Sequence, residues 1–437
     1  MFFLYLLNLA AYPAVLVFGG IYFTRYFRLS ILNPLTLVLG ASVPTILITS
    51  LAGPAVILED GLFNIYFQYA LLVSNVHELL GTAMLIFLVR YFSKKKAFSE
   101  LTERIIRTGG PARPERMRVA ALVFLGLYFV FFVLLAQHSF SVAEWIKNPR
   151  VGYQLHRTGA GQWYALAITS LSVSLVLATI YARSSLSVVV ITPIYLTLIY
   201  ILGSKGLVIF FGVYVLIILT VREYKYLPLM TVLVGSTAVI LVVSNFVSTF
   251  GSVGLDSIAN YSDGYSNASR YYQRYLDGSL PLYHGQIFFS SFWGIVPRAL
   301  YPDKPYVYGV IKVLDVFYPG AAEQTNTPAF ATVDYFADFG WAGVLLSALL
   351  NPASVFTALL YVTVLPRLRM LNIRRNNGHS RTLTYASLLL IAPSFLLFFD
   401  FPNNLILFVV IAGVIETFNR IRFTDGRSNK IPVPLSG

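Results

Sequence analysis

Long apolar runs, separated by short polar segments, make up most of this 437-residue chain. Each of eleven runs is about 20 residues long, which is the length that an α-helix needs to cross the hydrocarbon core of a bilayer. The runs lie near residues 3–23, 35–57, 66–91, 119–136, 163–181, 186–202, 207–221, 228–249, 340–364, 383–399 and 404–421. The pattern predicts an all-α polytopic membrane protein with about 11 transmembrane helices.

The hydrophobic pattern also divides the chain into four parts. Residues 1–249 hold the first eight predicted membrane helices, and residues 340–421 hold the last three. Between them, residues 250–339 form the longest stretch that cannot lie in lipid, and its five prolines from Pro297 to Pro328 exclude one long regular helix. We expect short helices in this large loop and a disordered tail over residues 422–437.

The composition supports a membrane protein and indicates how it is oriented. Only 12% of the residues are charged, about half of the share in a soluble domain, and the mean hydropathy is +0.70. Nine basic residues lie between Arg90 and Arg118, and the positive-inside rule places that loop in the cytoplasm. Eleven spans then put 23 of the 32 Lys and Arg residues inside, the N-terminus and the large loop outside, and the C-terminus inside.

Arg270 and Arg274 are the first candidate binding residues in the large loop. Their surroundings, SNASRYYQRYLDG, predict a short helix, and the spacing of four places both guanidinium groups on one face. Each guanidinium presents a fixed fork of donors that suits a phosphate or diphosphate. The alternative is a solvated surface or a contact with lipid headgroups.

Three other cations on the predicted outer face are candidates for the same role. Arg298 and Lys304 lie among prolines in VPRALYPDKP and have little conformational freedom to lose on binding, although Asp303 offers either of them an ion pair. Lys205 occupies a Gly-Ser-Lys-Gly turn between two apolar runs, where the composition alone favours ordinary snorkelling over a contact with a lipid phosphate.

Four residues of the large loop are candidates for a general base. Such a base contributes roughly 10²–10⁴ to a rate. The carboxylates nearest the ninth predicted membrane helix compete with the one histidine of the loop; together they are Asp334, Glu323, Asp338 and His284. The alternative for the aspartates is a favourable interaction with the N-terminal end of a helix dipole.

His77 and Glu78 lie midway along the third apolar run. An ionisable side chain there costs about 2.5–3.5 kcal/mol on insertion scales, so the pair needs a partner or a polar cavity. We expect Asp400 and Asn403 to border the same cavity. A hydrogen bond satisfied within the helix bundle is the alternative to a functional role.

Several motifs are absent from the sequence. It contains no Walker-type phosphate loop, which argues against ATP as an energy source, and no His/Asp/Glu cluster with metal-ligand spacing. It has no cysteine, which excludes disulfides and thiolate sites. No basic patch interleaved with aromatic residues lies outside a membrane context, so nucleic acid is not an expected partner. We expect no cofactor and no metal.

The layout and several motifs resemble the O-antigen polymerase family, whose members join oligosaccharide repeat units. The resemblance rests on the Gly203–Gly206 turn, the late outer loop, VPRALYPDKP and an Asp-x-Gly-x-x-Gly exit that begins at Asp338. It covers residues 186–343 in motif and the whole chain in layout. Lys205 is a departure, because relatives more often have arginine in that turn.

The resemblance implies an inverting, metal-independent membrane glycosyltransferase of the C type. Such an enzyme transfers a growing glycan from undecaprenyl diphosphate to a carrier-linked repeat unit, on the periplasmic face of the bacterial cytoplasmic membrane. Cations would stabilise the leaving diphosphate, and the available set is Arg270, Arg274, Arg298, Lys304 and Lys205. The implied partners are the glycan donor and acceptor, the lipid bilayer and a chain-length regulator protein.

Two alternative functions remain open at this point. An O-antigen ligase would use the same donor with a lipid A-core acceptor. A transporter of lipid-linked oligosaccharides would place its charges at mid-membrane in broken, repeated helices. His77 and Glu78 favour transport, whereas the charges concentrated in one outer loop favour an enzyme.

Overall fold

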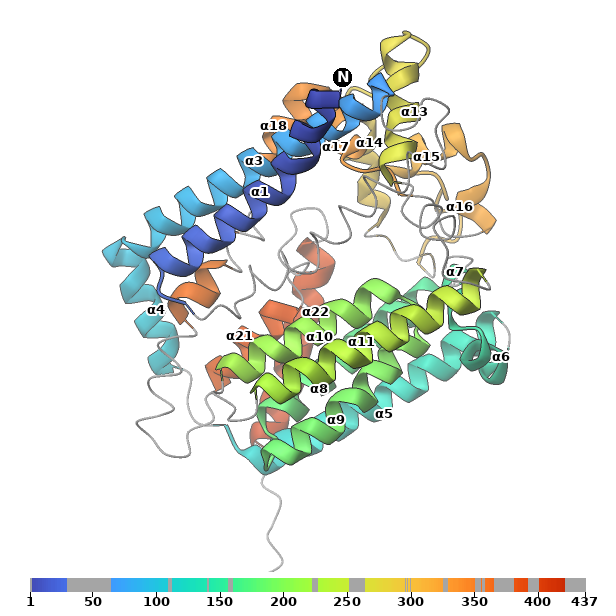
Figure 1. The fold of residues 1–437 in the computed structure, drawn as a ribbon. Coiled ribbons are helices and arrows are strands. Elements are labelled where there is room, and N and C mark those ends of the chain that lie inside the picture. The colour runs from blue at the N-terminus through green and yellow to red at the C-terminus, as the bar shows by residue number, and fades with distance from the viewer. Residues whose placement is uncertain are drawn as a thin grey trace, which may run out of the picture.

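A computed structural model describes most of the chain as a set of helices (Figure 1). It describes residues 2–29, 64–108, 112–139, 141–155, 160–221, 227–250, 264–324, 329–364, 381–391 and 401–420, apart from residues 295, 297, 299, 350–354, 356 and 357. Every regular element within these ranges is helical. The predicted all-α class is therefore confirmed for this part of the chain.

Seven of the described helices form a bundle, which the turquoise, green and red ribbons of Figure 1 show. They are α5 (Pro114–Ser139), α8 (Gly161–Ile180), α9 (Ser185–Ile201), α10 (Lys205–Val221), α11 (Leu227–Phe250), α21 (Arg381–Ile391) and α22 (Phe401–Arg420). Two short helices, α6 (Val142–Lys147) and α7 (Pro149–Leu155), cover one end of this bundle.

A second group of helices is organised around α3 (Ile65–Ser93), with α1 (Phe2–Tyr26) along its side. Further along the chain, α4 (Lys96–Thr108), α18 (Trp341–Leu349) and a π-helical turn at Leu360–Val364 belong to this group. An outer layer of short helices gathers at the N-terminal end of α3 (Figure 1). It contains α13 (Gly264–Leu276), α14 (Gln286–Ser290), a 3₁₀ turn at Ser291–Gly294, α15 (Ile311–Phe317), α16 (Ala321–Gln324) and α17 (Val333–Phe339).

Four of the described helices are long and apolar enough to cross a membrane: Leu6–Tyr26, Ile65–Ser93, Pro114–His138 and Gly161–Ile180. Shorter apolar helices lie in α9, α10 and α11. The chain is thus an integral membrane protein, whereas the count of eleven spans stays a prediction. The expected span over residues 35–57, the middle of the span over residues 340–364 and the tail from residue 422 lie outside the described residues.

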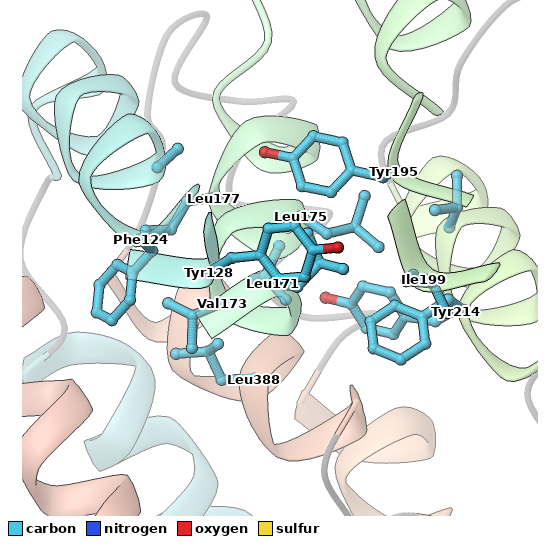
Figure 2. Packing of buried hydrophobic residues seen from close by; sticks show 14 of the residues in the cluster. Phe124, Tyr128, Leu171, Val173, Leu175, Leu177, Tyr195, Ile199, Tyr214 and Leu388 are labelled. Atoms are coloured by element: carbon cyan, nitrogen blue, oxygen red, sulfur yellow. The ribbon is translucent and has the colours of Figure 1, made fainter. Parts of the chain in front are cut away.

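The interior of the bundle is apolar, and several of its buried hydroxyl groups bind backbone carbonyls. Figure 2 shows Tyr128, Leu171 and Tyr195 among the packed side chains. The hydroxyl of Tyr128 donates to the carbonyl of Leu198 at 3.0 Å. In the same way, the Ser174 hydroxyl donates to the carbonyl of Ala121 at 2.7 Å. These bonds remove the cost of burying a polar group.

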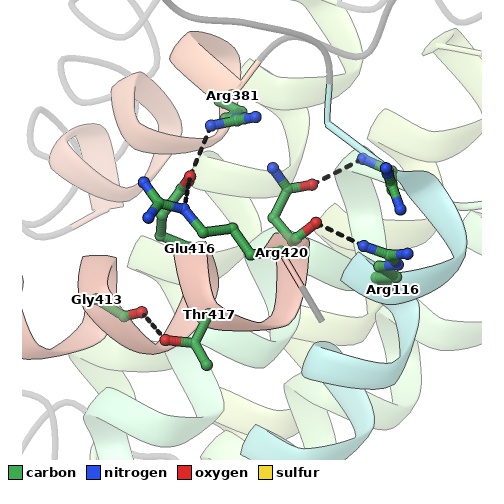
Figure 3. Close-up of polar contacts among 8 residues, drawn as sticks. Arg116, Arg381, Gly413, Glu416, Thr417 and Arg420 are labelled. Carbon is green, nitrogen blue, oxygen red and sulfur yellow. Dashed lines mark hydrogen bonds and ion pairs between the residues drawn. The ribbon is translucent and has the colours of Figure 1, made fainter. Parts of the chain in front are cut away.

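Charged groups gather where α21, α22 and the start of α5 meet (Figure 3). Arg381 Nη1 lies 2.6 Å from Glu416 Oε1, and Arg420 Nε lies 3.1 Å from the same oxygen. Arg116 Nη1 donates to the backbone carbonyl of Asn419 at 2.7 Å. These contacts join three helices that are distant in the sequence.

The outer layer has its own aromatic core, to which α3 contributes its first turns. Tyr69 of α3 packs edge-on against Tyr272 of α13, and Tyr272 packs in the same way against Phe336 of α17. The indole N–H of Trp341 donates to the Tyr69 hydroxyl at 3.0 Å. With 29 residues α3 is about 43 Å long, longer than the roughly 30 Å hydrocarbon core. One helix therefore reaches both the bilayer and the outer layer.

Candidate active site

A pocket of about 540 Å³ lies where α3 meets α17 and α15. The lining side chains come from three separate stretches of the chain: His77, Glu78, Val310, Leu314, Ala329, Phe330, Thr332, Asp334 and Tyr335. The pocket thus brings the ionisable pair of the long apolar helix together with a carboxylate of the large loop.

His77 and Glu78 contact each other inside this pocket. His77 Nδ1 lies 3.2 Å from Glu78 Oε1, and since an ionised carboxylate only accepts, the imidazole N–H donates. The two side chains are 13% and 30% exposed. The imidazole also stacks on the ring of Tyr335, with the centroids 5.0 Å apart and the planes 11° apart. The sequence predicted a partner or a polar cavity for each of these ionisable side chains. The structure has both, since the two side chains contact each other and line the pocket. The other expected neighbours, Asp400 and the side chain of Asn403, lie outside the described residues.

Asp334 is half-buried in the first turn of α17. Burial raises the pKa of Asp334 above the ordinary value of an aspartate. Hydrogen bonds from the backbone N–H groups of Tyr335 and of Asp334 itself, together with the charge of His77, lower the pKa of Asp334 by less. A carboxyl group with a raised pKa is a better proton acceptor near neutral pH than an exposed one.

The backbone just before α17 is strained. Thr332 has φ of 40°, a left-handed conformation that is a genuine outlier for a β-branched residue. Its hydroxyl lies 2.7 Å from the hydroxyl of Ser74 on α3. Strain that the surrounding contacts hold in place is typical of functional sites. The contact fixes where the chain enters α17.

Asp338 lies at the other end of α17 and faces α14 instead of the pocket. It is 3% exposed, and its carboxylate accepts from the backbone N–H groups of Gly285, Ile287 and Phe288 at 2.7, 3.2 and 2.7 Å. Both oxygen atoms are occupied in holding the start of α14.

The two remaining candidate bases do not line the pocket. His284 is exposed, with a positive φ of 50°, and its backbone N–H donates to the carbonyl of Asp338 at 2.9 Å. Glu323 is exposed on the four-residue α16. Of the four candidates, Asp334 alone borders the pocket.

The predicted short helix around Arg270 and Arg274 is present as α13. Both arginines are exposed. Arg270 Nη1 donates to the hydroxyl of Tyr318 at 3.2 Å, and the Arg274 guanidinium lies 4.8 Å from the centre of the Phe317 ring. Both arginines therefore rest against the end of α15.

The aromatic rings beneath these arginines reach the pocket. Phe330 packs against Phe317 and Tyr318, with ring centroids 5.3 and 6.4 Å apart, and Phe330 lines the pocket. The Tyr318 hydroxyl donates to Asn267 at 2.7 Å, and Asn267 donates to the carbonyl of Ala329, another lining residue, at 3.1 Å. The arginine pair and the pocket are thus connected through one aromatic group.

Arg298 and Lys304 bind the backbone of their own loop. Arg298 Nη1 donates to the carbonyls of Pro302 and Lys304 at 3.1 and 2.6 Å, and its guanidinium lies 3.8 Å from the centre of the Tyr306 ring. Lys304 Nζ donates to the carbonyl of Val296 at 2.9 Å. Burial, and then the charge of Arg298, lower the pKa of Lys304. These contacts close the proline-rich loop on itself.

The last cationic candidate is in the bundle. Lys205 begins α10, and its side chain is outside the described residues. Across the described ranges, no three His, Cys, Asp or Glu side chains lie close enough together to hold a metal ion.

The fold and this pocket define a polytopic α-helical membrane protein with a polar pocket under an outer helical layer. Two curated proteins match the chain, the O-antigen polymerases of Salmonella typhimurium and Salmonella typhi. Each is 32% identical over 225 residues, which is 50% of this chain and 54% of the relative. The chain therefore spans about half the length of the curated relatives that it matches. These matches confirm the resemblance to the O-antigen polymerase family. No family model and no solved structure matches.

Proposed function

We propose that this protein is a glycosyltransferase that polymerises oligosaccharide repeat units carried on a lipid diphosphate, as for O-antigen or a related surface polysaccharide. The similarity to two O-antigen polymerases supports this class of reaction. The observation that carries the proposal is the pocket itself. It holds a half-buried carboxylate with a raised pKa, and two exposed arginines contact the aromatic group that reaches the pocket.

In the proposed reaction the acceptor sugar binds in the pocket and Asp334 accepts the proton of its attacking hydroxyl. The hydroxyl oxygen forms the new bond to the anomeric carbon of the donor glycan. The bond from that carbon to the carrier diphosphate breaks at the same time, and the diphosphate leaves with the electron pair. Attack from the opposite face inverts the configuration at the anomeric carbon.

Arg270 and Arg274 are the cations that we assign to the leaving diphosphate. Their side chains are exposed on α13 and are in no ion pair that is described for this chain, and their guanidinium groups contact Tyr318 and Phe317. Two fixed cationic donors aimed at developing negative charge stabilise a transition state without a metal ion.

The other candidates fall into two groups. Asp338, Arg298 and Lys304 are engaged with backbone groups, and we assign them to holding the outer layer together. Glu323, His284 and Lys205 remain candidates on sequence alone.

We further propose that the pocket faces the periplasm from the bacterial inner membrane. The outer layer that lines the pocket gathers at the N-terminal end of α3 and meets His77 and Glu78 midway along the helix, whereas Arg90, Lys94 and Lys95 lie at its C-terminal end. The positive-inside rule assigns the basic end to the cytoplasm, which places the pocket outside. The N-terminus is then outside and the C-terminus inside, with eleven spans. A chain-length regulator protein remains a proposed partner.

A reconstituted reaction tests the function. Purified protein would receive its native carrier-linked repeat unit with EDTA and without nucleotide, and the products would be separated on a gel. We expect a ladder of lengthening glycans from the wild type. Asp334→Asn should fold normally and lose about 10²–10⁴ of the rate, because the base is gone.

Three outcomes would contradict the proposal. A ladder that requires a divalent metal would remove the metal-independent mechanism. Transfer of a glycan to lipid A-core without any ladder would identify a ligase. A wild-type rate in Asp334→Asn would exclude Asp334 as the base.

A further inference from the structure

Two contacts from α3 enclose Asp334 along the chain. Ser74 contacts Thr332, two residues before Asp334, and His77 stacks on Tyr335, the residue directly after it. Ser74 and His77 are three residues apart, so they lie on one face of α3. The segment that carries Asp334 is therefore held on both sides by the same face of one long helix.

The backbone at Tyr335 is also held from the opposite direction. A Cβ atom placed on Gly343 of α18 would lie 2.1 Å from the carbonyl oxygen of Tyr335. Only glycine, which has no Cβ atom, allows α18 to approach this carbonyl so closely. Tyr335 thus sits between α18 on its backbone side and the imidazole of His77 on its ring.

We propose that His77 is a positioning residue for Asp334: Glu78 orients the imidazole, and the imidazole, stacked on Tyr335, fixes the carboxylate and supplies the positive charge that it faces. This inference rests on the proposed role of Asp334. It assigns a function to the one ionisable pair that the sequence placed inside an apolar helix.

The groups around Asp334 determine how the site responds to pH. His77 and Glu78 come from α3, and Tyr335 comes from α17. From α13, Tyr265 has its pKa raised to about 12 by burial, and burial also raises the pKa of Tyr272 well above its ordinary value.

No other charged side chain of the neighbouring helices faces Asp334 in the described residues. The charged side chains of α15 are directed elsewhere, since Lys312 contacts Gln286 and Asp315 binds the N–H of Gly320. α18 carries no charged residue. Because the tyrosines stay neutral at working pH, His77 and Glu78 set the charge that Asp334 faces.

This arrangement determines in which direction the loss of His77 changes the pKa of Asp334. A protonated imidazole favours the ionised form of a nearby carboxylate. Removing that charge takes away one of the interactions that oppose the desolvation of Asp334, so the pKa of Asp334 rises further. A smaller fraction of Asp334 is then deprotonated at acidic pH, and the acidic limb of the rate profile moves to higher pH.

The test is the pH dependence of kcat in His77→Gln, which keeps a polar side chain of similar reach but removes the charge. We expect the acidic limb to move to higher pH, so that the loss of rate relative to the wild type is greater at pH 6 than at pH 8. Some loss should remain at pH 8, because Gln does not restore the stack on Tyr335. The matched control is His138→Gln, an exposed histidine at the end of α5 away from the pocket. It should keep the wild-type profile.

A second pair of variants tests the stack independently of charge. Tyr335→Leu removes the ring on which His77 lies, whereas Tyr335→Phe keeps it. We expect the Leu variant to fall at least tenfold below the Phe variant in kcat at pH 8. This comparison also decides the proposal if His77→Gln does not fold.

The outcomes separate this inference from the proposed function. If Asp334→Asn polymerises like the wild type, the assignment of the base fails and the role of His77 fails with it. If Asp334→Asn is inactive while folded His77→Gln keeps the wild-type pH profile, only the role of His77 is overturned. Equal rates in Tyr335→Leu and Tyr335→Phe would overturn the positioning role as well.

Discussion

The helix bundle and the outer layer bury polar groups in opposite ways. In the bundle the buried polar side chains are mainly hydroxyls. Several of them bind a carbonyl of their own helix, as Thr192 does with Val188, or of a neighbouring helix, as Tyr128 does with Leu198. In the outer layer Asp338 is the one fully buried carboxylate in the described residues, and Asp334, His77 and Glu78 line a pocket.

This difference between the bundle and the outer layer shows which part of the protein accommodates buried charged side chains. Burying a hydroxyl costs little free energy when it binds a helix carbonyl, whereas a buried carboxylate needs several hydrogen-bond donors or a polar cavity. The bundle keeps its ion pairs at the end where α21 and α22 meet α5. We infer that the bundle anchors the protein in lipid and that the junction of α3 with the outer layer carries the chemistry.

Of the variants that test this comparison, the substitution of either arginine of the pair should reduce the polymerisation rate most. Arg270→Ala or Arg274→Ala should each abolish polymerisation, with a loss of about 10²–10³ or more in rate, because each removes a donor to the leaving diphosphate. Both side chains are exposed, so the apparent melting temperature should stay near that of the wild type. The measurement is the ladder assay at saturating repeat unit.

Arg150→Ala is the matched control for the arginine pair. Arg150 is the second residue of α7, at the end of the bundle, and its guanidinium lies 5.1 Å from the centre of the Tyr153 ring, much as that of Arg274 lies over Phe317. It should polymerise normally. Normal polymer from both single variants of the pair would remove Arg270 and Arg274 from the site.

The next largest effect should be on stability and should come from Asp338. Asp338→Ala removes the acceptor of three backbone N–H groups at the start of α14, at an expected cost of about 3 kcal/mol or more. Asp338→Asn keeps one acceptor oxygen and should lose less. Thermal unfolding in detergent measures both changes against Asp334→Asn, which should unfold near the wild-type temperature.

The pair of aspartates thus separates stability from chemistry within one seven-residue helix. If Asp338→Ala unfolds at the wild-type temperature yet cannot polymerise, then Asp338 belongs to the reaction, and the division that we draw between the two ends of α17 is wrong.

The sequence predicted local features of the outer layer well. The polar and aromatic pattern of SNASRYYQRYLDG predicted α13, and the insertion cost of His77 and Glu78 predicted a partner or a polar cavity. Both predictions depend on residues that are close together in the chain, where helical spacing determines which side chains share a face.

The sequence could not predict which candidates would meet. Ser74 and Thr332 are 258 residues apart, and no local pattern places α3 against α17. Asp334 and Asp338 share the spacing of one helix face, yet different neighbours at the two ends of α17 give them different surroundings. Likewise, Arg298 looked available for binding because the carbonyls that hold it are positioned only by the folded loop.

The smallest predicted effect is a loss of stability in a variant of the bundle core. Tyr128→Phe removes the hydroxyl that binds the carbonyl of Leu198 and should cost about 1 kcal/mol of stability, because one buried hydrogen bond is lost and the ring still packs. Tyr128 is 1% exposed and lies in the core of the bundle, not in the outer layer. The apparent melting temperature should therefore fall slightly, while the rate per folded molecule stays at the wild-type value. A rate that falls without any change in stability would mean that the bundle takes part in turnover, and the bundle would then have to be treated as part of the catalytic apparatus.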